Sequence, residues 1–361
     1  MILKGTSVGL DVHARSVFAH AVDEDSGQVR REQLTPDYRH IIEWLLQLTA
    51  PVRVVYEAGP TGFGLARALA AAGIECLVAA PSKIVRPAGD RVKTDPRDAA
   101  HLARLLRLGE VVEVTVPDPV QEAARSLVRA REQARSDLMR ARNRLSKFLL
   151  ANGFVYYGGT TWTLAHNRWL RSLKFPHPML ARTFDADYDA VLSTLARRDD
   201  LDGQIAELAT EDRWAPTVTR LQCLRGVNTL SAFAMTVEIG DWSRLTGSTI
   251  GAYTGLTASE YSSGQSRSQG SITKTGNKHV RRLLVESAWV HRRPYRGAGA
   301  TLRRRWEAAG PAARARGHAG NRRLHRRWEH FDARKKNPNV ATVAIARELA
   351  GWCWSLAVMD E

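Results

Sequence analysis

Ser7–Asp11 (SVGLD) is a short apolar run that ends in an acid, and two further apolar runs follow it, Val17–Val22 and Val29–Leu34. The polar turn Asp23–Gln28 (DEDSGQ) separates these last two runs. Apolar runs of this length, joined by short polar turns, predict three β-strands connected as hairpins. We therefore expect the chain to begin with three neighbouring strands, the first of which ends at Asp11.

Helical and extended patterns alternate after these strands. The periodicity of the apolar residues predicts helices over residues 37–48, 64–72 and 95–106, and strands over residues 52–56 and 75–80. Three strands followed by helix, strand, helix, strand and helix is the order of an RNase H-like fold. We expect an α/β domain of this kind over residues 1–115.

Four carboxylates fall where such a fold brings its chain segments to one edge of the sheet. Asp11 ends the first strand, Glu57 follows the fourth, and Asp95 and Asp98 begin the closing helix. Their three-residue spacing turns Asp95 and Asp98 towards the same side of that helix. Clustered carboxylates repel one another unless a cation lies among them, and hard oxygen ligands favour Mg²⁺. We predict that these four acids bind Mg²⁺ and are catalytic, as is typical of phosphodiester chemistry.

Each acid also has an ordinary structural interpretation. Asp95 could cap its helix, Asp98 could face the helix dipole, and Glu57 could be a solvent-exposed acid at a strand end. Asp11 is harder to explain in this way, because an acid that ends an apolar strand needs a partner. His13 lies near these acids in sequence, and we expect a surface or supporting histidine rather than a ligand.

A long helix is predicted for the next part of the chain. Residues 121–151 contain no Gly or Pro, and positions spaced alternately by four and three residues from Leu127 to Phe148 are apolar, except Arg131. This heptad seam predicts a coiled coil, and a second helix over residues 188–210 would pack antiparallel to the first. The arm could pack only within its own chain or, as we favour, could dimerise and contact nucleic acid.

The C-terminal part is expected to be mainly helical. Residues 221–241 predict two helices joined at Gly226-Val227. This pattern resembles a helix-hairpin-helix, whose glycine-containing turn exposes backbone N–H groups to a DNA phosphate, and the alternative is an ordinary helical hairpin. Further helices are predicted over residues 277–291 and 340–358.

A loop rich in Gly and Ser precedes the helix that begins near residue 277, and it contains Tyr261–Gly264 (YSSG). The cations that flank the two serines of this loop are Arg267, Lys274, Lys278, Arg281 and Arg282. Serine attack on phosphate needs proton removal and positive charge near the phosphoryl oxygens. The loop supplies the charge but no obvious base. It could therefore carry a nucleophile assisted by the metal site, or it could be a flexible phosphate-binding loop without chemistry.

Positive charge is concentrated in two segments of the chain. The net charge is +16. Residues 291–336 carry 13 Arg and 2 Lys against 3 acids, and residues 120–147 carry 7 Arg and 1 Lys against 3 acids, so all other residues sum to −1. Charge localised in this way predicts a nucleic-acid-binding surface, because Arg suits phosphate recognition. The alternative is a set of solvated helix faces.

A short pattern occurs twice in the first of these segments. Leu302–Glu307 (LRRRWE) is echoed by Leu324–Glu329 (LHRRWE). The predicted nucleic-acid contacts are Arg303, Arg304, Arg305, Arg326 and Arg327. The neighbouring Trp residues could stack on bases or could anchor helices in a core.

The remaining features narrow the class of protein. No apolar run is long enough to span a membrane, and the N-terminus lacks the pattern of a signal peptide. The three cysteines are isolated, so neither disulfides nor structural zinc are expected. A cytoplasmic protein without membrane association is the simplest expectation.

Five motifs of the chain resemble the DEDD-type transposases of the insertion sequence 110 family. They are GLDVHA around Asp11, YEAGPTG around Glu57, KTDPRDAAHLARLL around Asp95 and Asp98, LRGV…EIGD, and GLTASEYSSGQ…GSITKTGNKHVRRLLVESAW. The resemblance covers nearly the whole chain. It implies a RuvC-like domain that binds Mg²⁺ over residues 1–115, a coiled-coil connector over residues 116–215, and a C-terminal transposase domain over residues 216–361. The family's nucleophile precedes glycine, which selects Ser263, with Ser262 as the alternative.

The same resemblance implies a reaction and its partners. A bridge RNA would pair with target and donor DNA, and strand exchange would pass through a covalent serine–DNA link. The acids of one protomer would join the serine of another, so a dimer, or a tetramer when active, is expected at the bacterial nucleoid. The stretch 296–336 looks longer than in the family. A metal-dependent nuclease that uses water, and a nucleic-acid-binding protein with a degenerate site, are the alternative functions.

Overall fold

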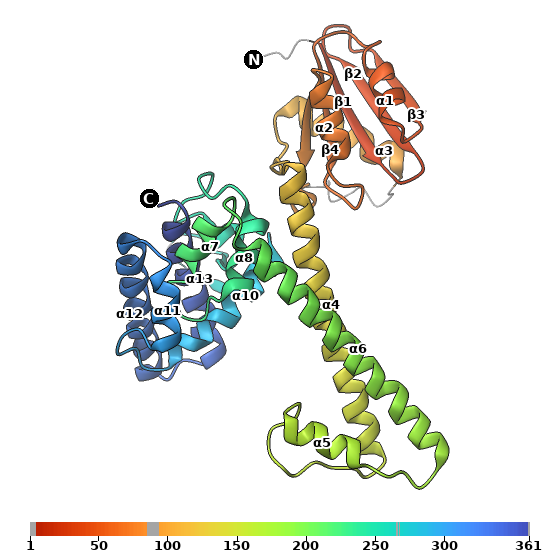
Figure 1. Ribbon diagram of the computed structural model, residues 1–361. Helices are drawn as coiled ribbons and strands as arrows, with labels where there is room; N and C mark the ends of the chain where they lie inside the picture. Colours follow the sequence, from red (N-terminus) through yellow and green to blue (C-terminus); the bar gives the residue numbers. More distant parts are fainter. Residues whose placement is uncertain (1–4, 85–93, 265, 267, 360–361) are drawn as a thin grey trace. The chain divides into compact units, whose positions relative to one another are not determined.

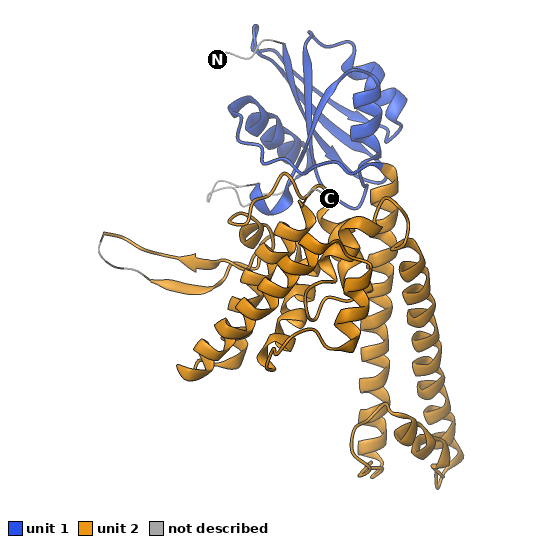
Figure 2. Cartoon of the chain, turned by 60° about the vertical axis from the view of Figure 1, so that its left-hand side comes forward, with its two compact units in different colours: residues 1–118 blue, residues 119–361 orange. Residues whose placement is uncertain are grey.

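The computed structural model describes residues 5–84, 94–264, 266 and 268–359. The chain forms two compact units, Met1–Asp118 and Pro119–Glu361 (Figure 2). The first unit ends three residues after the predicted boundary at 115. The predicted C-terminal domain and the predicted connector, apart from its first three residues, belong to the second unit. None of the helices within the described ranges combines the length and apolar character needed to cross a bilayer.

The first unit is a five-stranded sheet with helices, and it confirms the predicted order of elements. These are β1 (Thr6–Val12), β2 (Val17–Asp23), β3 (Val29–Leu34), α1 (Tyr38–Leu45), β4 (Val52–Glu57), α2 (Gly64–Ala71), β5 (Glu75–Ala79), a short 3-10 helix (Pro81–Lys83) and α3 (Asp95–Leu108). The strand order is β3-β2-β1-β4-β5. β1 to β3 pair antiparallel, and β4 pairs parallel with both β1 and β5. β1 is therefore the central strand.

Helix α3 packs closely against the central strand because of Gly9. A Cβ atom at Gly9 would lie 2.1 Å from the backbone oxygen of Ala99 and 2.5 Å from the backbone nitrogen of Ala103. Any larger residue would collide with the backbone of α3. Farther along α3, Leu102 and Leu106 pack on the face of the sheet opposite to α1 and α2. The glycine in β1 therefore allows α3 to lie close to β1, the strand that carries Asp11.

The second unit begins with a long helical arm (Figure 1). α4 (Pro119–Ala151) packs against α6 (Pro178–Leu208), and α5 (Leu164–Ser172) lies near the far end of the arm. The first of these helices matches its prediction closely. α6, however, begins at Pro178 rather than at Tyr188, because proline fits the first turn of a helix, where its missing N–H costs nothing. α5 was not predicted.

Four positions of the predicted heptad seam are buried in the middle of α4. Ala134, Leu138, Ala141 and Leu145 are buried there. Arg131, the polar position in the seam, forms a two-pronged ion pair with Asp202 of α6, with N···O distances of 2.6 and 3.2 Å. The guanidinium is therefore accommodated inside the hairpin by a matching acid.

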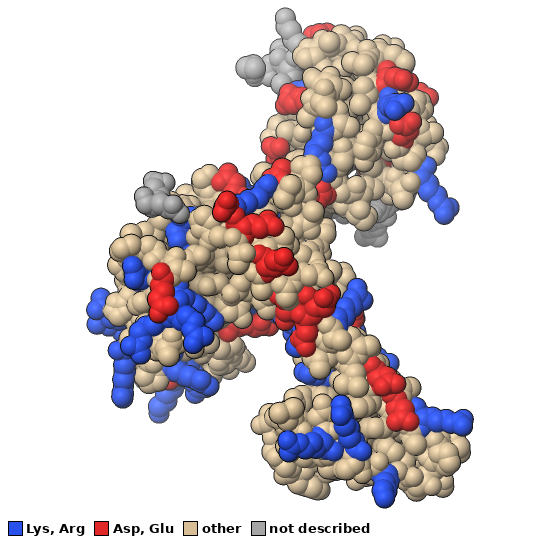
Figure 3. All heavy atoms as spheres, in the orientation of Figure 1, with Lys and Arg blue, Asp and Glu red and all other residues tan. Residues whose placement is uncertain are grey.

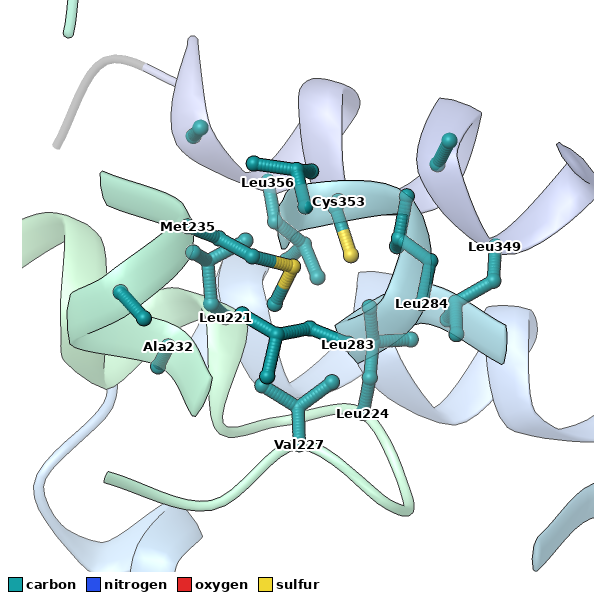
Figure 4. Packing of buried hydrophobic residues seen from close by; sticks show 14 of the residues in the cluster. Leu221, Leu224, Val227, Ala232, Met235, Leu283, Leu284, Leu349, Cys353 and Leu356 are labelled. Atoms are coloured by element: carbon teal, nitrogen blue, oxygen red, sulfur yellow. The ribbon is translucent and has the colours of Figure 1, made fainter. Parts of the chain in front are cut away.

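The other elements of the second unit form a helical body with one small hairpin. They are α7 (Ala215–Leu221), α8 (Thr229–Ile239), α9 (Ile250–Tyr253), β6 (Ala258–Glu260), β7 (Gln269–Ile272), α10 (Lys278–Ala288), a 3-10 helix (Trp289–Arg292), α11 (Ala300–Glu307), α12 (Pro311–Ala333) and α13 (Pro338–Ala357). Leu221, Met235, Leu284, Cys353 and Leu356 meet in its core (Figure 4). The predicted helices near residues 277–291 and 340–358 are confirmed as α10 and α13.

The turn between α7 and α8 does not fit the predicted phosphate-binding hairpin. The N–H of Arg225 donates to Oδ1 of Asn321 at 2.8 Å, and the N–H of Val227 donates to a carbonyl of the same turn. A Cβ atom at Gly226 would lie 2.4 Å from the backbone oxygen of Ser287, so the turn packs directly on α10. Because these amides are used or covered within the chain, the structure supports the alternative, an ordinary helical hairpin.

Candidate catalytic sites

The ends of β1 and β4 and the start of α3 carry the four predicted acids. Asp11 is the penultimate residue of β1, Glu57 ends β4, and Asp95 and Asp98 lie in the first turn of α3. The last parallel pair of β1 and β4 is Leu10 with Tyr56. Asp11 and Glu57 are the next residues, so they lie at the same end of two neighbouring strands. The fold thus carries all four acids on the segments that the sequence predicted.

Asp11, His13 and Asp95 form the tightest part of this group. Nε2 of His13 lies 3.3 Å from Oδ2 of Asp11 and 3.6 Å from Oδ1 of Asp95. One ligand atom from each of the three residues lies within 4.8 Å of the others. Among the described residues, Glu57 and Asp98 do not belong to this group of three. Two carboxylates and an imidazole at these distances could hold a divalent cation.

The negative charge at Asp11 is only partly compensated. Its side chain is 18% exposed, and burial raises the pKa of its carboxyl group. The nearby His13 lowers that pKa, whereas the charges of Asp95 and Asp98 raise it again, and the net shift is upward. Asp98 therefore acts on Asp11 through its field although it lies outside the group of three. A cation bound among these acids would favour the ionised form of Asp11.

One expectation about a single residue changes here. Thr94 is the N-cap residue of α3 and Asp95 is the first residue of the helix, so Asp95 is not the cap. His13 is 50% exposed, as expected of a surface residue, and it lies beside two of the acids. Its position two residues after Asp11, directly beyond β1, was the available signal.

The two candidate serines lie in the β6–β7 hairpin, which projects from the helices of the second unit (Figure 2). Ser263 and Ser266 exchange two backbone hydrogen bonds, of 3.2 and 3.1 Å, at the end of the ladder. Gly264 follows with a φ of +58°, a conformation that glycine adopts readily. The serines therefore lie in a β-hairpin, in the stretch that the sequence analysis treated as a Gly/Ser-rich loop.

The two hydroxyl groups have different surroundings. Oγ of Ser262 donates to Oε1 of Glu260 at 2.9 Å. Ser263 is exposed, and within the described part of the chain its hydroxyl makes no hydrogen bond. The sequence predicted no base near the serines, but Glu260 supplies a carboxylate beside Ser262.

The predicted cations around the hairpin are engaged to different degrees. Arg281 donates to the carbonyls of Thr254 and Thr275, both at 2.9 Å. Arg282 forms ion pairs with Glu132 of α4 and Glu286 of α10. The exposed cations are Lys274 and Lys278, and Arg267 lies outside the described residues. Arg281 and Arg282 therefore tie elements of this unit together.

The repeated Arg/Trp pattern lies on α11 and α12. Trp328 is 1% exposed and belongs to the core, and Nε1 of Trp306 donates to the carbonyl of Cys223 at 3.2 Å. Arg305 donates to the carbonyl of Val227 at 2.9 Å. The tryptophans therefore anchor these helices, as the alternative interpretation held. Of the predicted contacts, those with exposed side chains are Arg303, Arg304, Arg326 and Arg327.

Basic side chains gather over α11 and α12 in the space-filling view (Figure 3). Because the two tryptophans are packed inside, the arginines are the side chains of the repeated pattern that a ligand can reach. This surface is suited to backbone phosphates rather than to stacking on bases.

Comparisons with known proteins agree with this arrangement. Residues 8–152 match the profile of DEDD-type IS110 transposases, described as "Transposase", and residues 218–300 match the "Transposase IS116/IS110/IS902 family". A Sinorhizobium fredii protein named as a transposase, y4qE, is 38% identical over 97% of this chain and 88% of its own length. The transposase for insertion sequence element IS1533 of Leptospira borgpetersenii is 31% identical, over 91% of this chain and 97% of its own. The chain therefore belongs to the IS110 family of insertion-sequence transposases.

Proposed function

We propose that this transposase cleaves and rejoins DNA with a serine nucleophile, assisted by Mg²⁺ at the acids of an RNase H-like, RuvC-like first unit. The observation that carries the proposal is the cluster of Asp11, His13 and Asp95, in which the charge of Asp11 is not fully compensated. The order of strands and helices along the chain and the packing of α3 on β1 support the RNase H-like interpretation.

The residues of the first unit fit a hard divalent cation. Asp11 and Asp95 would hold Mg²⁺, and Glu57 and Asp98 would complete the set from neighbouring segments. When bound, the ion would neutralise charge on the phosphoryl oxygens. His13 lies against both acids, where it can orient their carboxylates or accept a proton.

The hydroxyl of Ser263 would attack a backbone phosphorus atom of DNA. The Oγ–P bond forms, the serine proton passes to a base, one P–O bond to deoxyribose breaks, and the departing oxygen becomes a hydroxyl after protonation. Attack by a DNA hydroxyl on the same phosphorus then releases serine and rejoins a strand. The exposed, unengaged hydroxyl of Ser263 supports its assignment. Ser262 is the alternative, with Glu260 as its base.

The partners that we propose are element-end DNA, target DNA and a bridge RNA that pairs with both, within a homodimer or tetramer. The acids of one protomer would then act with the serine of another. The motifs of the family support this assembly, and the exposed Arg303, Arg304 and Arg326 offer contacts to phosphates.

The test combines purified protein, Mg²⁺, the RNA encoded beside the gene and labelled element-junction DNA. A protein–DNA adduct that survives denaturation is expected for the wild type. It should be absent in Ser263→Ala and should form on the order of 10²–10³ more slowly in Asp11→Asn. Ser262→Ala and Glu260→Gln decide between the serines. An adduct that persists in Ser263→Ala but disappears in both of these variants would assign the reaction to Ser262.

A mixing experiment tests whether two protomers share one catalytic site. Ser263→Ala and Asp11→Asn protein are combined, and each should be inactive or nearly inactive alone. Adduct formation in the mixture supports a shared site, because each protein supplies what the other lacks. An inactive mixture of correctly assembled protein would contradict the shared site.

The second candidate is a metal-dependent nuclease that uses water, and the acid cluster on its own favours it. Such an enzyme would cut DNA in Ser262→Ala and in Ser263→Ala without forming any adduct. Its activity would still disappear in Asp11→Asn. Cleavage without an adduct in the wild type would therefore replace the serine mechanism.

A further inference from the structure

We infer that the groove between the β6–β7 hairpin and helices α12 and α13 binds a single strand of nucleic acid next to the serines. The groove has a volume of about 1100 Å³. Its lining comes from the hairpin residues Gln269–Ile272, from the region of α9 between residues 247 and 258, and from residues of α12 to α13. The inference rests on the proposed function, and it adds where in the second unit the polynucleotide lies.

The groove combines exposed positive charge with apolar lining residues. Arg316, Lys336 and Arg347 line it, and all three are exposed. Within the described residues, Lys336 and Arg347 have no side-chain hydrogen bond or ion pair, so their charges are available to a ligand. Val340, which is 61% exposed, and Val343 contribute to the apolar part.

The acid at the groove does not cancel this charge. Glu348 is the only acidic residue among the described residues that line the groove. Its Oε1 atom lies 2.9 Å from Nε of Arg323, and its Oε2 atom lies 3.9 Å from Nε of Arg327. Because Glu348 already has cationic partners, the remaining lining charge is positive and would attract a polyanion.

A single polynucleotide strand matches this chemistry. Its phosphates require cations that follow the backbone, and its unpaired bases require apolar surface. The groove is slightly larger than the roughly 300–1,000 Å³ of pockets that enclose a drug-sized ligand, so it can take a few nucleotides. A duplex has its bases covered by pairing and stacking, and it would leave the apolar lining residues without contacts.

The position of the groove connects it to the reacting serines. Gln269, which lines the groove, pairs with Glu260 across the hairpin. Ser263 lies three residues beyond Glu260, a distance of roughly 10 Å along an extended strand. A polynucleotide that leaves the groove along the hairpin would therefore pass the serine hydroxyls.

The test measures binding in a Ser263→Ala background, so that no covalent chemistry contributes. Fluorescently labelled single-stranded DNA, single-stranded RNA and duplex DNA of equal length are titrated at several salt concentrations. The groove variant is Lys336→Gln with Arg347→Gln. The matched control is Arg39→Gln with Lys83→Gln, which removes the same charge from exposed positions of the first unit.

We expect the groove variant to bind single strands more weakly than the background protein does. A plot of log K against log salt has a negative slope, and this slope should become shallower by roughly 1.4. Each lost phosphate contact on a single strand contributes about 0.7, and the variant loses two cations. The control should keep its slope, and duplex binding should change less than single-strand binding. A larger effect with DNA or with RNA identifies which strand occupies the groove.

Three outcomes would overturn the inference: no binding of single strands, equal slopes for the groove and control variants, or an equal loss for duplex and single strand. These outcomes are separable from failure of the proposed function, which is read from the covalent adduct of protein with intact Ser263. If the groove variant forms the adduct normally and binds single strands as the background protein does, the groove inference is wrong and the serine mechanism is still supported.

Discussion

Two of the acid–histidine clusters among the described residues have opposite electrostatics. In the first unit, Asp11 lies beside His13 and Asp95, and its pKa is raised because burial and neighbouring acids outweigh the histidine. In the second unit, Glu238 lies beside His279 with its side chain 1% exposed. Burial alone would raise the pKa of Glu238, but hydrogen bonds and positive charge lower it well below its usual range.

The difference lies in the partners that each acid has. Glu238 accepts two hydrogen bonds from Arg129 at 2.9 Å, one from Asn277 at 2.9 Å and one from His279 at 3.3 Å. These partners come from α4, the N-cap of α10 and α10 itself, so the acid joins three helices. Within the part of the chain that the structure describes, Asp11 has no comparable set of cations, and His13 is the partner beside it. A buried acid whose charge is satisfied stabilises the fold, whereas one that lacks compensation is available to a metal ion.

The largest expected effect is on activity, at Asp11. Asp11→Asn should lower the rate of adduct formation by on the order of 10²–10³, because Mg²⁺ at such sites supplies several kcal/mol of charge stabilisation. The free energy of unfolding should not fall, since the substitution removes a charge that its neighbours disfavour. Single-turnover kinetics and urea unfolding of the same preparation measure the two quantities. A variant that unfolds more easily in proportion to its lost activity would contradict the distinction between the clusters.

The next effect is on stability, at Glu238. Glu238→Gln should lower the free energy of unfolding by about 2 kcal/mol, less than the roughly 3–5 kcal/mol for breaking a fully buried ion pair, because the side chain of Arg129 is 60% exposed. The matched control is Glu286→Gln, which removes a 56% exposed partner of Arg282 and should cost less than about 1 kcal/mol. Urea unfolding of the three proteins gives the comparison. If the free energy of unfolding falls equally in Glu238→Gln and Glu286→Gln, the buried Glu238 cluster stabilises the fold no more than an exposed ion pair does.

The contribution of Glu238 should also depend on pH with a defined sign. Its pKa is lowered in the folded protein relative to the ordinary value of 4.5, so ionised Glu238 stabilises the fold above about pH 4.5. That stabilisation is lost as the pH falls below 4.5 towards the folded-state pKa. The stability difference between wild type and Glu238→Gln should therefore be constant from pH 7 to 5 and should shrink below pH 4.5. A difference that grows on acidification would have the wrong sign.

The sequence predicted the first acid cluster better than the second, for a physical reason. The strand ending at Asp11 and the three-residue spacing of Asp95 and Asp98 are local signals, and the fold order joins them. The pair of Arg129 with Glu238 spans 109 positions, and no local pattern reports it. In the sequence, Glu238 appeared only as the first residue of the motif EIGD, without a predicted role.

Other differences between prediction and structure also come from tertiary contacts. Gly226 suggested a turn open to phosphate, but Ser287 and Asn321 cover it from distant helices. Trp306 and Trp328 suggested either stacking or anchoring, and only the packing of α11 and α12 decides in favour of anchoring. Residue types thus fixed the range of possible roles, and long-range contacts selected among them.

The smallest effect separates the two clusters by their response to Mg²⁺. A cation that binds only the folded protein adds about 1.4 kcal/mol of stability when its concentration is ten times its Kd. Mg²⁺ should therefore raise the Tm of the wild type and of Glu238→Gln by similar free-energy increments, although the second protein starts from a lower Tm. Asp11→Asn should lose most of the increment, because one of two converging carboxylates no longer carries charge. Thermal melts with Mg²⁺, with EDTA and with K⁺ at matched ionic strength measure this response. An equal Mg²⁺ increment in Asp11→Asn would place the bound ion elsewhere and would leave the raised pKa of Asp11 without a functional meaning.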